Sequence, residues 1–309
     1  MAAPGKKQRQ ASRQAFLALY TSSLAVLLAL AVSLLFLRPP VAPLAVVPVE
    51  PAASGEVPAT SAIQPEAVPA TTTQESQPSS TRGRLILVLD DAGYNLWQLE
   101  PFLELPFPLT IAVLPGLPYT AQVAALALAA GKEVILHQPM EALDGEDSGP
   151  GSLMLAMGDE AIRRILRVNM AQLPGAVGMN NHMGSMVTRN ERVMSLVLDE
   201  TARRGWYYLD SVTISGTVTG LVAERQNLSI WERSLFLDNS PEKDYILSRV
   251  QEGTRLAEKH GYAIMIGHVW SAELAQTLSE LYPHLLEQGY SLSTIAAMLL
   301  DKDNADTGH

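Results

Sequence analysis

The sequence predicts an α/β fold in which about seven or eight βα units form a closed or nearly closed barrel. From Arg84 onward, short runs of branched apolar residues alternate with helical patterns, as expected for a mainly parallel sheet. Several of these runs end in a residue that can bind a ligand or move a proton. The units occupy roughly 215 residues, slightly fewer than the ~250 of a typical barrel. An open doubly wound sheet is the alternative, although no glycine-rich phosphate loop follows the first strand.

The N-terminal part of the chain differs in composition from the rest. Residues 1–14 form a basic tail, and residues 15–37 are an uncharged apolar run, long enough to cross a bilayer as a helix of about 20 residues. The basic side should stay in the cytoplasm, so we predict a single-pass signal anchor in a bacterial inner membrane, with the C-terminal part on the periplasmic side. A cleaved signal peptide is the alternative, although its apolar region is normally about 7–15 residues long.

Residues 38–82 are rich in Pro, Ala and Thr and show no apolar periodicity, which predicts a disordered linker. The net charge of −10 argues against a nucleic-acid partner, because such partners are bound by basic patches. The chain has no cysteine, so a metal would have to be held by histidines and carboxylates. Nothing in the sequence points to a protein partner.

The predicted domain covers residues 83–300 and is followed by a polar tail at 301–309. Its strands are runs rich in Val, Ile, Leu and aromatic residues, as expected for a sheet buried on both faces. We predict strands at 84–89, 109–114, 133–137, 176–179, 206–209, 235–237, 262–266 and 291–295.

Caps and breakers delimit the helices between these strands. Asn95 and Asn190 are suited to N-caps, and Gly131 is suited to end an alanine-rich helix at Ala130. The other predicted helices have apolar residues on one face. We predict helices at about 96–104, 159–172, 191–204, 241–259 and 272–287, and an alanine-rich helix that ends at Ala130.

The first strand ends in the pair Asp90-Asp91, followed by Ala92 and Gly93. If the extended backbone continued through the pair, the two carboxylates would point in different directions and serve two roles. The alternative is a turn in which they cap the next helix and Gly93 supplies a positive φ. Since the carboxyl ends of barrel strands share one mouth, we predict a pocket lined by residues from several strand ends: Asp90, Asp91, His137, Asn180, Asn181, His182, Asp210 and His268.

Two histidines and an aspartate are a common ligand set for a catalytic Zn²⁺, which activates water and polarises a carbonyl. A second aspartate can act as general base and a further histidine as general acid. The alternative for His137 and His268 is that they satisfy buried polar groups at strand ends. Asp210 and Ser211 are equally suited to capping a loop.

These motifs resemble a known family. Asp90-Asp91-Ala-Gly93 is similar to the Thr-Phe-Asp-Asp-Gly motif of polysaccharide deacetylases with the NodB homology domain. The strings His137-Gln-Pro-Met-Glu141, Asn180-Asn-His-Met-Gly-Ser185 and Gly267-His268 resemble more closely a divergent, YibQ-type branch. The resemblance covers about Arg84 to Leu299. It implies a distorted (β/α) barrel and a metal-dependent hydrolase of carbon–nitrogen bonds, which removes N-acetyl groups from peptidoglycan or another N-acetylated glycan.

The resemblance also implies roles for individual residues: Asp90 as base, Asp91 and His137 as metal ligands, and His268 as acid. The family's second metal histidine is replaced here by Glu141. Either Glu141 binds the metal, or His182 from the next strand takes that place; we expect His182. The family's arginine motif is absent. Six polar residues are expected to bind substrate or to support the metal ligands: Glu141, Asn180, Asn181, Ser185, Asp210 and Ser211.

Two other functions stay open at this point. The altered motifs are compatible with a binding or regulatory module that lacks turnover. A metal-free glycosidase would need two acids roughly 5–10 Å apart, for which Asp90 with Asp210 or Glu141 are candidates. Near the mouth, Trp231 or Trp270 could stack on a sugar ring, whereas the aromatic run at 206–208 is expected in the core.

Overall fold

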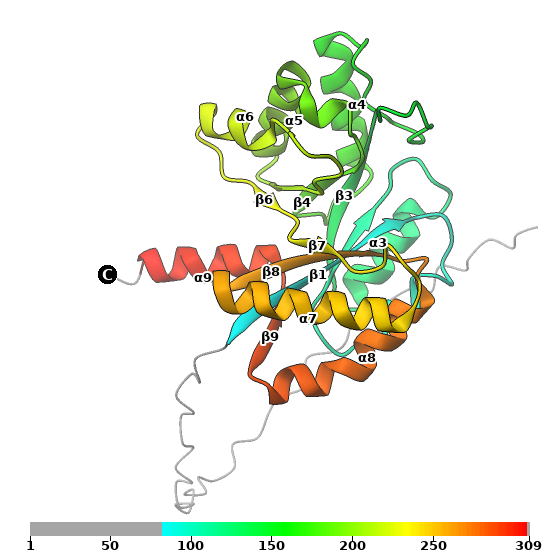
Figure 1. Cartoon of the computed structure of the whole chain (residues 1–309). Helices are drawn as coiled ribbons and strands as arrows, with labels where there is room; N and C mark the ends of the chain where they lie inside the picture. The colour runs from blue at the N-terminus through cyan, green and yellow to red at the C-terminus, as the bar shows by residue number, and fades with distance from the viewer. Residues whose placement is uncertain (1–81, 308–309) are drawn as a thin grey trace, which may run out of the picture. The chain divides into compact units, whose positions relative to one another are not determined.

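The computed structural model describes residues 82–307, which form a curled parallel sheet surrounded by helices (Figure 1). The predicted basic tail, the membrane helix at 15–37 and the linker up to residue 81 lie outside the described residues. None of the helices within 82–307 has the length and apolar character needed to cross a bilayer.

The strand order is β6-β5-β4-β3-β2-β1-β8-β7, with β9 also paired to β1, and all pairs are parallel. The strands are β1 Gly83–Ala92, β2 Thr110–Val113, β3 Glu133–Met140, β4 Gly178–Met183, β5 Tyr207–Asp210, β6 Trp231–Glu232, β7 Leu235–Phe236, β8 Tyr262–His268 and β9 Tyr290–Ser293. The order does not reverse within the sheet as it does in a doubly wound fold.

The sheet curls into a partial barrel. Its two edge strands, β6 and β7, are separated only by Arg233 and Ser234, and no ladder joins them in the described part of the chain. The linking residues bond to β5 and β8, the strands next to these edges: the Arg233 backbone N–H donates to Asp210 O (3.0 Å), and that of Ser234 donates to Ile264 O (2.8 Å). The predicted α/β fold is therefore confirmed. The parallel sheet is curled, but no hydrogen-bonded ladder joins β6 to β7 among the described residues.

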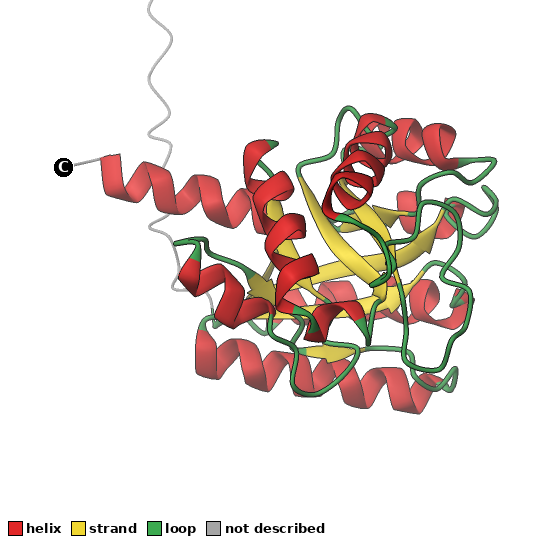
Figure 2. Cartoon of the chain, turned by 90° about the horizontal axis from the view of Figure 1, so that it is seen from above, coloured by secondary structure: helices red, strands yellow, loops and turns green. Residues whose placement is uncertain are grey.

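Helices cover the outside of the sheet, as the view from above shows (Figure 2). Figure 1 shows α4, α5 and α6 grouped near β3 and β4, and α7 and α8 along the side of β8 and β9. The helices are α2 Glu100–Leu103, α3 Thr120–Ala129, α4 Asp159–Ala171, α5 Glu191–Arg203, α6 Thr219–Arg225, α7 Lys243–His260, α8 Ala272–Glu287 and α9 Ile295–Thr307, with a 3₁₀ turn η1 at Val187–Arg189.

Side chains of β1 alternate between two apolar cores. Leu85, Leu87 and Leu89 of β1 face the outer core between sheet and helices. Ile86 and Val88 face an inner core inside the curl, together with residues of β2, β3, β5 and β8. Because the side-chain period of a strand is two, Asp90 follows Ile86 and Val88 into the interior at the carboxyl end.

The C-terminal helix α9 packs at the opposite, amino end of the strands. Ile295 is fully buried in the inner core, and the Ala296 backbone N–H donates to Glu133 Oε2 (3.2 Å) at the start of β3. Arg84, near the start of β1, pairs with Asp301 (2.6 Å). The sequence predicts a strand at 291–295 and a polar tail at 301–309, whereas the structure has β9 at Tyr290–Ser293 and a helix that runs on to Thr307. The short helix α6 is also absent from the prediction.

Candidate metal centre

Three predicted ligands converge at the carboxyl edge of the sheet. Asp91 Oδ1 lies 3.0 Å from His182 Nδ1 and 3.3 Å from His137 Nε2, and the two histidine nitrogens are 3.1 Å apart. The residues come from β1, β3 and β4, and one ligand atom of each lies within 4.8 Å of the others. His182 is therefore the third residue of this cluster. Glu141 was the alternative candidate for that position.

A bulge brings both carboxylates of the Asp90-Asp91 pair into this site. The ladder between β1 and β2 shifts register between Leu89 and Ala92, and Asp91 has a φ of 66°. The extended backbone therefore does not continue through the pair, and the two side chains are not forced to opposite faces. As a result, Asp90 Oδ2 lies 3.7 Å from His137 Nε2, close to the Asp91 contact.

The side chains fit a divalent transition metal. Asp91 Oδ1 is buried and accepts no hydrogen bond, which is costly for a carboxylate unless another group satisfies it. Burial opposes ionisation of Asp91, but the adjacent imidazoles of His137 and His182 hold its pKa well below the usual value. One ionised carboxylate oxygen and two imidazole nitrogens directed at the same space are a typical zinc ligand set.

Asn180 connects His137, a candidate metal ligand, to the second aspartate. Its Oδ1 is 2.8 Å from His137 Nδ1, which fits a donated Nδ1–H and leaves the Nε2 lone pair directed at Asp91. Its Nδ2 donates to Asp90 Oδ1 (2.8 Å) and to Ser211 Oγ (3.3 Å). Burial raises the pKa of Asp90, although the nearby His137 and His268 oppose this shift. Asn180 thus fixes both the ligand and the candidate base.

His268 is held by an aspartate that was not among the predicted site residues. Its Nδ1 lies 2.9 Å from Asp238 Oδ1, and its backbone N–H donates to Asp238 Oδ2 (2.8 Å). Burial alone would lower the pKa of His268, but the hydrogen bond and charge of Asp238, with the charges of Asp90 and Asp91, raise it to about 9. The sequence did carry a signal, since Asp238 follows a predicted strand as the other site acids do.

Other predicted residues bond to loops around the centre. Glu141 Oε2 accepts from the Leu155 N–H (2.7 Å), and Ser185 Oγ accepts from the Leu143 N–H (2.9 Å). Asn181 Oδ1 accepts from the Ser211 N–H (2.9 Å). These contacts hold the loops that follow β3, β4 and β5, and none of them involves a metal ligand.

Asp210 belongs to the outer face of β5. Its neighbour Leu209 packs in the inner core, so Asp210 shares the opposite face with Tyr208 of the outer core. Its carboxylate accepts from the Val212 N–H (2.8 Å) and the Thr217 hydroxyl (2.8 Å). The structure places Asp210 as the cap of the loop after β5. Asp210 and Glu141, the two candidates for a pair of acids with Asp90, thus both accept hydrogen bonds from loop backbone groups.

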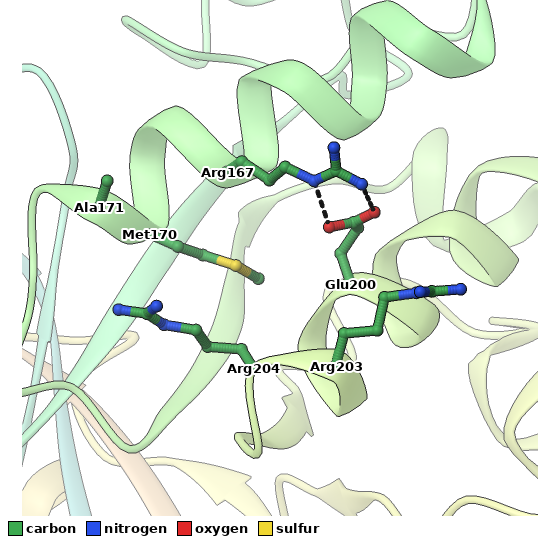
Figure 3. Close-up of a pocket in the computed structure, with 6 residues that line it drawn as sticks. All are labelled: Arg167, Met170, Ala171, Glu200, Arg203 and Arg204. Atoms are coloured by element: carbon green, nitrogen blue, oxygen red, sulfur yellow. Dashed lines mark hydrogen bonds and ion pairs between the residues drawn. The ribbon is translucent and has the colours of Figure 1, made fainter.

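A separate hollow lies between α4 and α5, on the outside of the fold (Figure 3). Figure 3 shows Arg167 forming a two-pronged pair with Glu200, with bonds of 2.8 and 2.7 Å. The Arg167 bonds and the nearby Arg163 lower the pKa of Glu200 despite its burial. These ion pairs join two helices, and the hollow carries no group with the geometry of a catalytic site.

Comparison with known proteins agrees with the motifs. A family model described as divergent polysaccharide deacetylase matches residues 87–299. The chain is 36% identical over 186 residues to the uncharacterised protein YibQ of Escherichia coli (strain K12), an alignment that covers 60% of this chain and 58% of YibQ. It is 32% identical over 192 residues to an uncharacterised protein of Haemophilus influenzae, covering 62% of this chain and 68% of that protein.

The fold also matches a solved structure. The crystal structure of an uncharacterised protein from Agrobacterium tumefaciens C58 superposes with a TM-score of 0.66 at 20% sequence identity, covering 71% of this chain and 91% of that one. At this identity the similarity concerns the fold alone.

Proposed function

The chain belongs to the divergent polysaccharide deacetylase family, and we propose that it is a metal-dependent hydrolase that removes N-acetyl groups from peptidoglycan or another N-acetylated glycan. The observation that carries the proposal is the unsatisfied, buried Asp91 Oδ1 between His137 and His182, with Asp90 and His268 nearby. This set contains a group for each step of amide hydrolysis.

Asp91, His137 and His182 would hold the ion, for which we propose Zn²⁺. When bound, the metal would make water more acidic and polarise the acetamide carbonyl. Asp90 takes the proton of the attacking water, and its raised pKa makes it a stronger base than an exposed aspartate. His268 gives a proton to the nitrogen as the carbon–nitrogen bond breaks. Acetate and the free amine of the sugar are the products.

The alternative of a binding module without turnover is based on the replacement of a family histidine by Glu141 and on the absence of the family's arginine motif. His182 lies where a third ligand is needed, which supplies a substitute for the missing histidine and favours the hydrolase. We also propose that residues 15–37 anchor the protein in the inner membrane and that the linker at 38–82 carries the domain into the periplasm.

The proposal is tested by measuring the metal content of the purified chain and the acetate that it releases from N-acetylated glycan fragments. We expect one tightly bound divalent ion per chain and acetate release that is lost with a chelator and restored by Zn²⁺. Stoichiometric metal without release would favour the binding module. A folded chain that takes up no Zn²⁺ would contradict the proposed mechanism.

The Asp238–His268 pair predicts a specific dependence of activity on pH. His268 can donate a proton only while protonated, so activity is expected below its pKa of about 9 and should be lost as the pH rises through that value. Asp238→Asn removes the charge that supports the protonated form. We expect the alkaline limb of kcat/KM to move to lower pH, with a loss of about tenfold near pH 9.

The pH profile of Asp238→Asn is compared with that of the parent chain at equal metal loading. A variant profile that falls by the same factor at every pH would show that Asp238 only supports the local fold.

A further inference from the structure

The two edge strands of the sheet meet at an open seam, and the proposed acid lies close to it. In the described part of the chain, β6 pairs with β5 alone and β7 pairs with β8 alone. β7 is two residues long, and it is the one strand between the seam and β8, which carries His268. An element with so few backbone contacts is weakly held by them. The position of His268 therefore depends on side-chain contacts at the seam.

Arg233 lies in the link between β6 and β7 and contacts both sides of the seam. On the side of β5, its Nε–H donates to Ser211 O (2.6 Å) and its Nη2–H donates to Val212 O (2.8 Å). On the side of β7, its guanidinium carbon lies 3.7 Å from the centroid of the Phe236 ring. A guanidinium this close to an aromatic face is attracted to it. These three contacts tie the loop after β5 to β7.

On the side of β5, the contacts of Arg233 hold a strained turn. Val212 has a φ of 46°, which β-branched residues rarely adopt and which persists only when the surroundings hold it. Arg233 bonds to the carbonyl oxygens of Val212 and of the residue before it, Ser211. Ser211 Oγ accepts from Asn180 Nδ2 (3.3 Å), which also donates to Asp90 Oδ1 (2.8 Å). Arg233 thus fixes the turn from which this network reaches the candidate base.

On the side of β7, the contact of Arg233 leads to the candidate acid. Phe236 stacks on the His268 imidazole with a centroid distance of 5.8 Å and an interplanar angle of 21°. Trp270 also stacks on His268, at 4.8 Å and 19°, and its Nε1–H donates to Asp91 Oδ2 (3.1 Å). One series of contacts therefore runs from the guanidinium at the seam, through the Phe236 ring and the imidazole, to the metal centre.

We propose that Arg233 is a positioning residue, which bridges the open seam and keeps the His268 imidazole at a fixed place in the site. Through the Ser211 turn it also holds the network that reaches Asp90. Arg233 acts through Phe236 and Ser211 and not by contact with the reacting atoms. A lysine would supply the charge, but not a planar group that bonds to two carbonyls while it faces a ring. This inference rests on the proposed function and adds to it how the proposed base and acid are held.

Arg233→Ala in the full-length, zinc-loaded chain tests the inference. We expect kcat to fall about 10-fold to 100-fold while KM for glycan fragments stays within about twofold, because a displacement of about 1 Å can cost about 10²-fold in rate. The metal should be retained, since β1, β3 and β4 carry its ligands and are joined through β2 by continuous ladders. Millimolar guanidinium should restore part of kcat, because a hollow of about 550 Å³ opens beside Arg233. Arg233→Lys should stay impaired.

The NMR signals of the His268 imidazole give a second readout that needs no turnover. The chain has six histidines, so labelling of histidine gives few signals, and His268→Gln identifies the one of interest. The stacked Phe236 and Trp270 rings shift the His268 ring protons. We expect these signals to move in Arg233→Ala and to return with guanidinium. Phe236→Leu should move the same signals, and guanidinium should not restore them.

Arg249→Ala is the matched control. Arg249 also bonds to Phe236, since its Nε–H donates to the backbone carbonyl (3.1 Å), but its guanidinium pairs with Glu252 on the same helix. We expect its kcat to stay within about twofold of the parent and the His268 signals to stay in place. An equal loss of kcat in Arg249→Ala and Arg233→Ala would assign the effect to the local fold and reject the inference.

The inference is overturned if a folded Arg233→Ala keeps the kcat of the parent, or if kcat falls while the His268 signals stay in place. A parent chain that releases no acetate would reject the proposed chemistry, and the NMR signals then decide the inference by themselves. Signals that move in Arg233→Ala and return with guanidinium support it. Signals that stay in place, or that guanidinium does not restore, reject it.

Discussion

His182→Ala is expected to lower the affinity of the chain for Zn²⁺ by more than about 100-fold. The substitution removes one of three ligands and leaves Asp91 Oδ1 with His137 as its one remaining neighbour in the set. Loss of a residue that merely supports a ligand typically costs 10–100-fold, so loss of a ligand should cost at least as much. Competition with a chromophoric chelator measures the affinity, and elemental analysis of the purified variant measures the metal retained.

Glu141→Gln is the control for this experiment. The glutamine carbonyl can still accept the bond from the Leu155 N–H, so the loop after β3 should keep its position. We expect its zinc affinity to stay within about threefold of the parent. The opposite outcome, in which Glu141→Gln loses the metal and His182→Ala keeps it, would assign the third ligand to Glu141.

Asp90→Asn is expected to lower acetate release by about 10³-fold while the metal is retained. The asparagine is nearly isosteric and can still accept the bond from Asn180 Nδ2, so the geometry around His137 should persist. It cannot take a proton from water, and general base catalysis typically contributes 10²–10⁴-fold. The rate is measured as acetate formed at saturating glycan, with metal content determined on the same samples.

The metal content distinguishes a base from a ligand. Asp90 Oδ2 is 3.7 Å from His137 Nε2, slightly farther than Asp91 Oδ1 at 3.3 Å. If Asp90→Asn lost the ion as completely as His182→Ala, Asp90 would be a ligand and the general base would have to be sought elsewhere. Retained metal with retained activity would exclude Asp90 from the chemistry.

Much of the site follows from the sequence because each strand is short and ends abruptly. Apolar runs followed by Asp90, His137 and His268 mark the carboxyl-terminal parts of three strands, although β1 and β3 run on to Ala92 and Met140. Parallel strands deliver these parts to one edge. His182 lies beside His137 for the same reason, since β3 and β4 are neighbours and pair His182 with Pro139. Adjacency of strands was enough to bring these groups together.

Two features of the centre depend on backbone and side-chain contacts that the sequence does not encode locally. The bulge at Asp91 turns both carboxylates toward His137, and no residue type in the pair requires it. Asp238 supports His268 from 30 positions away, across the pairing of β7 with β8. Such partners become visible only when the strand order is known.

By itself the sequence determined the α/β class and the chemical types of the residues at the site, because apolar runs and chemically distinctive residues are local properties. The tertiary structure alone decided which face of each strand is inside. Both faces of this sheet are apolar, so the pattern at 207–210 does not say that Leu209 points inward and Asp210 outward. Packing also decided that α9 lies against the amino end of the curl, since the contact of Ile295 with the inner core exists only after folding.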